Sequence, residues 1–173
     1  MAATVQWRED NGTATGSPSR GTTRSNASNM NWKSVDDSTT PYTGATIIAG
    51  QNSYQKYNYL QFGGTFNQIS AGKFAHTAGS IGAGLTLVSK ITSTYATPST
   101  SAMTGSTNIT STTPINSGAS VNFATSGPEG SSPSATLSAS GYSQYIVTQL
   151  QTQASAAAGD IGSQTLTFQW NEN

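Results

Sequence analysis

The chain has 173 residues, of which 34% are hydrophobic and only 8% are charged, and its formal net charge is zero. A neutral chain has no field that would draw it to nucleic acid or to an anionic membrane. The absence of cysteine excludes disulfides and thiolate metal sites, and the length suits one domain with its own core.

The first residues, Met1–Trp7, contain neither the basic nor the apolar region of a cleaved secretion signal. No segment has the roughly 18 consecutive apolar residues that a membrane helix needs. We therefore expect a protein that folds in a cytoplasm and has no membrane partner.

Residues 1–44 are predicted to form an extended N-terminal arm. They are rich in Gly, Ser, Thr and Asn and contain few apolar side chains, so they bury too little to offset their own ordering entropy. Trp7 and Trp32 stand out because indole groups are seldom left in water, and we interpret them as anchors that dock the arm onto its own domain or a neighbouring subunit. The alternative is a flexible leader with two incidental tryptophans. As anchors, they predict an arm that is ordered only in an assembly.

The charges of the arm predict ion pairs within it or across a subunit boundary. Glu9-Asp10 and Asp36-Asp37 are adjacent pairs, and adjacent side chains of an extended segment point in opposite directions. Neither pair is therefore a natural general acid and base at one substrate. Their expected ion-pair partners are the basic residues of the same arm: Arg8, Arg20, Arg24 and Lys33. The candidate partner-binding residues, which would anchor the arm, are two of these arginines and the two tryptophans: Trp7, Arg20, Arg24 and Trp32.

Residues 45–173 are predicted to form the folded domain, which begins near Ala45. The aromatic run from Tyr54 to Phe62 and the segment Thr65–Ser70, separated by Gly63-Gly64, indicate a β-hairpin. Lys73–His76 continues as a short strand.

The longest two-residue alternation runs from Ile81 to Tyr95 and predicts a half-buried strand, bent or bulged near Ser89. The best partner to cover its apolar side is the last stretch, Gln164–Trp170, which alternates in the same way. No catalytic residue lies in either segment.

Between these two stretches the chain alternates loops and short strands. Thr97–Pro114 has the composition of a long loop, and Ser120–Ala124 and Ala135–Ser138 are predicted as short strands. Gln144–Thr152 alternates again and is predicted to form a terminal hairpin with the last stretch, although Gln149–Ala158 also suits a helix. The whole pattern predicts an all-β fold, an antiparallel β-sandwich or jelly-roll-like domain with an extended N-terminal arm.

Residues that could carry chemistry are few. His76 is the only histidine, and we expect it to be a strand residue with one hydrogen bond. Gly79–Gly84 lacks the Lys-Ser/Thr ending of a phosphate loop and opens a strand where such a loop opens a helix. The tyrosines at 54, 57 and 59 are expected to be core or cross-strand residues. We therefore expect no catalytic site, no metal and no cofactor.

The N-terminal arm and three further segments carry a resemblance to a known class of proteins: Tyr54–Ile69, Tyr145–Gln151 and Gly159–Trp170. With them the chain resembles small virion proteins of tailed bacteriophages, and among these the β-sandwich decoration or cement proteins of the capsid. The resemblance implies a non-enzymatic protein on the outside of a shell built from the major capsid protein. It also implies a homotrimer that links neighbouring capsomers in a virion assembled in the host cytoplasm.

The main alternative is a tail or receptor-binding fibre module whose loop Thr97–Pro114 recognises a host-surface glycan. A hydrolase is the weakest interpretation, because no nucleophile and base pair is evident around His76.

Overall fold

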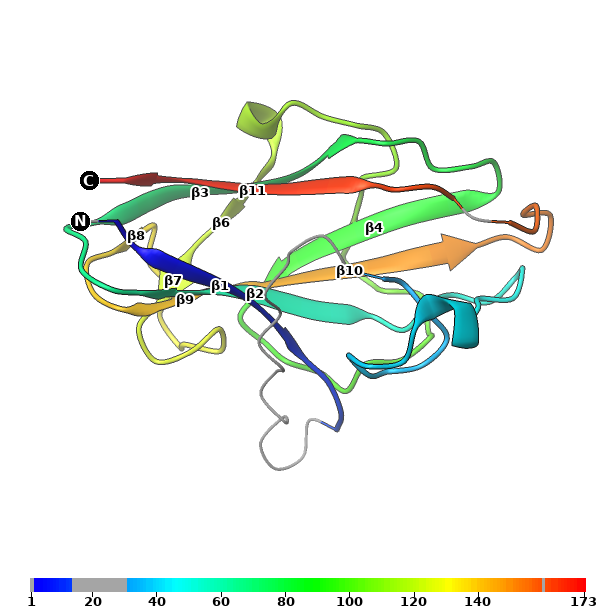
Figure 1. Cartoon of the computed structure of the whole chain (residues 1–173), viewed down its shortest axis with the longest axis horizontal. Helices are drawn as coiled ribbons and strands as arrows, with labels where there is room; N and C mark the ends of the chain where they lie inside the picture. Colours follow the sequence, from blue (N-terminus) through cyan, green and yellow to red (C-terminus); the bar gives the residue numbers. More distant parts are fainter. Residues whose placement is uncertain (1, 14–30, 160) are drawn as a thin grey trace.

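In this computed structural model residues 2–13, 31–159 and 161–173 are described, and their strands pair antiparallel throughout. The strands form two sheets (Figure 1). The larger sheet contains β1 (Thr4–Asp10), β2 (Lys56–Gly63), β4 (Leu85–Thr92), β5 (Thr107–Asn108), β7 (Phe123–Ala124), β9 (Gly141–Ser143) and β10 (Tyr145–Thr152). The smaller contains β3 (Ile69–Ala78), β6 (Ala119–Val121), β8 (Thr136–Leu137) and β11 (Thr165–Glu172).

In the larger sheet the strands are linked in the order β5-β4-β10-β2-β9-β7, with β10 paired to residues 56–58 of β2 and β9 to residues 61–62, and β1 also pairs with β2. In the smaller sheet it is β11-β3-β6, with β8 also beside β3. Two short 3₁₀ turns, η1 (Tyr42–Gly44) and η2 (Ile115–Ser117), lie in the connections. The predicted all-β, sandwich or jelly-roll-like fold is confirmed.

Strand β2 is buried on both of its faces, which explains its run of aromatic residues. Leu60 and Phe62 point between the two sheets, into a cluster that we call the inter-sheet core. Tyr57 and Tyr59 point to the far side of the larger sheet, where a second group, the tyrosine cluster, forms. The members of each group are Trp7, Leu60, Phe62, Ile69, Phe74, Val121, Phe123, Leu137 and Ile146 for the core, and Tyr57, Tyr59, Tyr95, Tyr145 and Val147 for the tyrosine cluster.

The N-terminal segment differs from the predicted arm. Residues 4–10 form β1 and pair with β2 along their whole length, from Thr4 opposite Gly63 to Asp10 opposite Tyr57. Residues 31–45 are also attached, because the Tyr54 backbone N–H donates to the Lys33 carbonyl at 3.0 Å and the Trp32 Nε1 donates to the Thr148 hydroxyl of β10. Within the described residues, a boundary at residue 44 therefore does not separate an arm from a domain. The prediction failed because it counted apolar residues and did not expect charged ones to be buried in pairs.

Both predicted hairpins are wrong. Strands β2 and β3 belong to different sheets, and so do β10 and β11, so each connection crosses from one layer to the other. After β2 the chain turns through Gly64, which has a φ of 81°, a value that glycine adopts without strain. Alternation identifies the buried face of a strand but not the sheet to which it belongs.

The alternating stretch Ile81–Tyr95 is a strand only over β4, because Gly82–Leu85 forms a turn in which the Leu85 N–H donates to the Gly82 carbonyl at 3.2 Å. Its neighbours in the sheet are β10 and β5, not β11. Ile91 of β4 and Leu166 of β11 nevertheless pack against the same inter-sheet core from the two layers. The predicted loop Thr97–Pro114 contains the short β5, and Gln149–Thr152 is strand, not helix.

Candidate functional site

The two predicted tryptophan anchors dock the N-terminal segment onto its own domain. Trp7 lies in β1 within the inter-sheet core and is 9% exposed. Its Nε1 is buried and has no hydrogen-bond partner among the described residues. Trp32 is half-buried, and its Nε1 donates to the Thr148 hydroxyl on β10 at 3.1 Å. Arg20 and Arg24, the other two candidates, lie outside the described residues.

A buried ion pair fixes β1 to β2. The Lys56 Nζ donates to the Glu9 carboxylate at 3.0 Å, and the two side chains are 1% and 2% exposed. The same ammonium donates to the Asp37 carbonyl at 3.1 Å, which ties residues 31–45 to both strands. Burial lowers the pKa of Lys56, and the charge of Glu9 acts against that shift. A buried ammonium of this kind depends on its carboxylate partner.

A second ion pair, between Lys33 and Asp37, lies within residues 31–45. Lys33, which is buried, donates to the Asp37 carboxylate at 2.8 Å and to the Thr40 carbonyl at 2.8 Å. The hydrogen bond from Lys33, followed by those from Thr40 and Thr39, holds the pKa of Asp37 well below its ordinary value. The segment that covers the end of the larger sheet is thus closed by charge-assisted hydrogen bonds.

Asp10 leaves β1 on the face opposite to Glu9, as adjacent residues of an extended segment should. Its carboxylate accepts a hydrogen bond from the Tyr145 hydroxyl at 2.6 Å and one from Tyr59 at 3.3 Å. Burial, then the hydrogen bond and charge of Asp10, raises the pKa of Tyr145. The Glu9-Asp10 pair therefore serves two separate structural sites, with Lys56 on the side of Glu9 and the two tyrosines on the side of Asp10.

His76 is a buried strand residue with contacts on both ring nitrogens. Its Nδ1 lies 2.9 Å from the Ile109 carbonyl oxygen and its Nε2 lies 3.1 Å from the Gln164 side-chain oxygen. The two contacts hold the ring between β3 and the segment before β11. No three His, Cys, Asp or Glu side chains of the described chain gather so that they could hold a metal ion.

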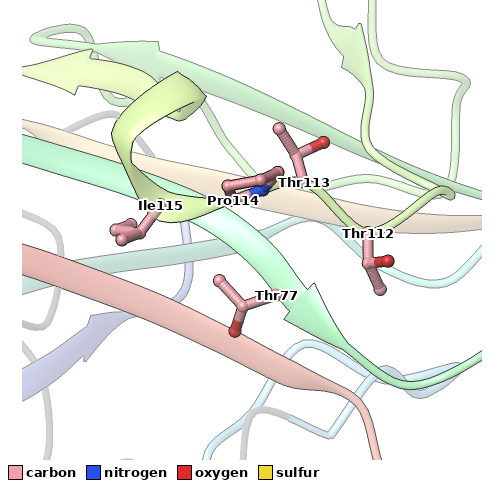
Figure 2. Close-up of a pocket in the computed structure, with 5 residues that line it drawn as sticks. All are labelled: Thr77, Thr112, Thr113, Pro114 and Ile115. Carbon is pink, nitrogen blue, oxygen red and sulfur yellow. The ribbon is translucent and has the colours of Figure 1, made fainter.

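A shallow hollow opens at the end of β3, beside the turn that leads into η2 (Figure 2). It has a volume of about 420 Å³ and is lined by Thr77, Thr112, Thr113, Pro114 and Ile115. The backbone N–H of Thr113 donates to the His76 carbonyl at 2.8 Å, which holds the turn against the strand. Hydroxyl groups with an apolar floor can bind a neutral polar ligand through hydrogen bonds.

The exterior of the domain carries very little exposed charge. Among the charged residues that the structure describes, Glu129 and Glu172 are exposed and Glu9, Asp10, Lys33 and Lys56 are buried. The others are half-buried: Arg8, Asp36, Asp37, Lys73 and Lys90. Charged residues are normally the most exposed of all, so this distribution is unusual. Sequence reasoning missed it because nothing in the local pattern distinguishes a lysine that is paired inside from one that is solvated.

Comparisons with known proteins add no relative, because no protein family, no curated protein and no solved structure matches the chain. In the described part of the chain, no helix has the length and apolar character needed to cross a membrane.

Proposed function

We propose that this chain is a non-enzymatic virion structural protein of a tailed bacteriophage, a decoration or cement protein. It binds the outer surface of the capsid, contacts the major capsid protein and copies of itself, and links neighbouring capsomers. The resemblance of Tyr54–Ile69, Tyr145–Gln151 and Gly159–Trp170 to such proteins supports the proposal. The observation that carries it is the charge-poor exterior of an antiparallel β domain.

Such an exterior suits a protein whose surface is buried against other proteins when it functions. Burying a charged group against another protein costs several kcal/mol unless it is paired, whereas hydroxyls and amides exchange water for protein hydrogen bonds at about even cost. Copies crowded on one shell also repel one another little when their exposed charges are few. The pair Lys56–Glu9 keeps both of its charges inside the domain, and the pair Lys33–Asp37 buries the lysine while Asp37 stays partly exposed.

The attachment of the N-terminal segment supports the same function. Trp7, Trp32 and the ion pair of Lys56 keep residues 4–10 and 31–45 on the domain, so the contact surface is largely preformed. A preformed surface loses little conformational entropy on binding, and repetition over a lattice adds many weak contacts together.

The proposal is tested by adding the purified chain to shells from which it has been removed and measuring binding at low and high salt. Because the exterior carries little charge, the affinity should change less than about threefold between low and physiological salt. Failure to bind any shell, or affinity that collapses on raising the salt, would contradict a charge-poor docking surface.

A tail or receptor-binding module is the second candidate, and the hollow beside η2 favours it. Three of its five lining residues are threonines, Thr77, Thr112 and Thr113, which can hydrogen-bond a glycan of the host surface. Titration of the chain with host-surface glycans distinguishes the two. Saturable binding that is lost in Thr112→Val, but kept in Thr136→Val on the exposed β8, would support the glycan module.

A further inference from the structure

The end strands of the two sheets differ in how well they are protected. An edge strand exposes unpaired N–H and C=O groups, and proteins blunt such edges by shortness, charge or proline. Here β5, β7 and β8 have two residues each and β6 has three, and β1 carries the charged run Arg8–Asp10. The remaining end strand, β11, has eight residues, no proline and no lysine, and its single charged residue is Glu172 at its end.

Strand β11 is also incompletely covered. Among the described residues it pairs on one side with β3, and no other strand pairs with it. Leu166, Phe168 and Trp170 pack against the inter-sheet core, and the centre of the Trp170 ring lies 5.5 Å from that of Phe62. All three side chains nevertheless remain half-buried. The open edge thus combines free backbone groups with apolar side chains that a further strand would cover.

We propose that β11 pairs antiparallel with β11 of a second copy of this chain, about a two-fold axis at Phe168. The alternation of the strand is self-complementary around that residue. Phe168 faces Phe168 of the second copy, Leu166 faces Trp170, and Thr167 faces Gln169. Every apolar residue then meets an apolar one on the inner side, and every hydroxyl or amide meets another on the outer side, which is the arrangement that stabilises cross-strand pairs.

The charge of the strand favours this antiparallel pair over a parallel pair in register. In the two-fold antiparallel pair, Glu172 lies opposite Gln164 of the second copy, whereas a parallel pair in register would place two Glu172 carboxylates side by side. The carboxylate of Glu172 is moreover already engaged by the backbone N–H of Ala3 at 2.7 Å. The register shifts of the β11–β3 ladder lie between Thr165 and Leu166 and between Gln169 and Asn171, and at both of them the extra residue is on β3, so β11 itself has no inserted residue.

The pairing would join the two smaller sheets into one continuous sheet across the dimer. It goes beyond the proposed virion function and does not depend on it, because it follows from the edge alone. It also differs from the homotrimer that the resemblance implies, since a two-fold edge contact closes at two copies.

The purified chain should sediment as a dimer, at twice the chain mass of 17.8 kDa, at high concentration in analytical ultracentrifugation. The double variant Thr167→Glu/Gln169→Glu places like charges opposite each other twice in the proposed register. It should raise the dissociation constant of the dimer at least about tenfold. Within one chain, residue 169 is opposite Lys73, which suits a glutamate, whereas Thr167→Glu removes the 2.6 Å hydrogen bond between the Thr167 and Thr77 hydroxyls. Circular dichroism therefore checks that the variant keeps its fold.

The matched control is Thr107→Glu/Asn108→Glu, the same change of charge on the exposed edge strand β5, which should leave the dimer intact. A second variant, Thr167→Lys/Gln169→Lys, should also dimerise more weakly alone and should form a heterodimer when mixed with the acidic variant. Because Lys73 lies opposite residue 169, circular dichroism checks the fold of this variant as well. This rescue depends on residues 167 and 169 facing each other across the interface, which a general loss of stability cannot imitate.

Three results would overturn the proposal: a wild-type chain that stays monomeric at high concentration, one that forms a trimer, or a dimer that the acidic variant does not weaken. Absence of the heterodimer would also overturn it. If the chain is monomeric alone but β11 becomes protected from hydrogen exchange on shells, the edge pairs with a strand of the shell protein, and the second-copy proposal is wrong.

Discussion

Removal of one charge from the buried ion pair between β1 and β2 tests how the N-terminal strand is held. In Glu9→Gln the shape of the side chain is kept, but the Lys56 ammonium, 1% exposed, loses its carboxylate partner. The Asp37 carbonyl at 3.1 Å remains as an acceptor, and the new amide oxygen can still accept. The charge, however, is no longer compensated.

Breaking a buried pair by removing one partner costs about 3–5 kcal/mol. We expect about 3 kcal/mol here, because the hydrogen bonds of Lys56 persist in part. For a domain of this size, about 2–4 °C is lost per kcal/mol, so the melting temperature should fall by roughly 6–12 °C.

The pH dependence of the variant gives a second, independent measurement. The pKa of Lys56 is already lowered from 10.5 by burial, and loss of Glu9 removes the group that acts most strongly against this shift, while Asp36 remains. Between the folded and unfolded pKa values the unfolded chain binds more protons, so stability rises with pH. Glu9→Gln should therefore recover part of its lost stability as the pH rises from neutral toward about 10, before tyrosines ionise.

Urea and thermal unfolding followed by circular dichroism measure these changes. Glu9→Gln/Lys56→Met removes both charges and should be more stable than Glu9→Gln alone, and Lys90→Met on the half-buried part of β4 should change stability by less than about 0.5 kcal/mol. A Glu9→Gln variant as stable as Lys90→Met, or a double variant less stable than the single one, would refute the reasoning.

Three further changes probe other contacts. The folded pKa of Tyr145 is raised above 10.0, so the wild type should lose stability as the pH rises beyond 10, and Tyr145→Phe should lose less over the same range in urea titrations. Trp32→Phe removes the hydrogen bond to Thr148 and should cost about 1 kcal/mol; an unchanged urea midpoint would show that the contact contributes nothing. A methyl group at Gly72 would overlap the backbone of β6, so Gly72→Ala should lower the free energy of unfolding by about 1–3 kcal/mol, as thermal unfolding measures. The control is Gly82→Ala, whose added carbon would lie 3.7 Å from its nearest neighbour, a side-chain atom of Leu85, and which should cost less than about 1 kcal/mol.

The strands themselves could be predicted because alternation reports directly on burial. The apolar positions of Gln164–Trp170 face the core as expected, and the aromatic run Tyr54–Phe62 is a strand over most of its length. The all-β class followed from these segments. Their pairing did not, because β2 and β3 are neighbours in sequence but lie in separate layers, and side-chain alternation is the same in either case.

The N-terminal strand was missed for a physical reason. Thr4–Asp10 contains three charged residues in succession, and composition alone predicts a solvated segment. In the fold, Glu9 and Asp10 are both buried because Lys56 and Tyr145 lie on the strands they reach, 47 and 135 residues further along the chain. Only the tryptophans signalled that this segment is attached, and the side to which they dock could not be read from the sequence.

The charge-poor exterior was the least predictable feature, because it depends on which charged residues are buried in the fold. Lys33 and Lys56 read as surface residues in the sequence and are buried in the fold. The only sequence signal for the hollow beside η2 was the Ser/Thr-rich loop Thr97–Pro114, which supplies three of the residues that line it.

The copy number of this chain in purified virus particles tests the central proposal most directly. Quantitative mass spectrometry against the major capsid protein measures it. A decoration protein that covers the lattice predicts hundreds of copies, at a ratio near one or a simple fraction such as one third. A handful of copies per particle would place the chain in the tail or a fibre, and its complete absence would contradict the virion proposal.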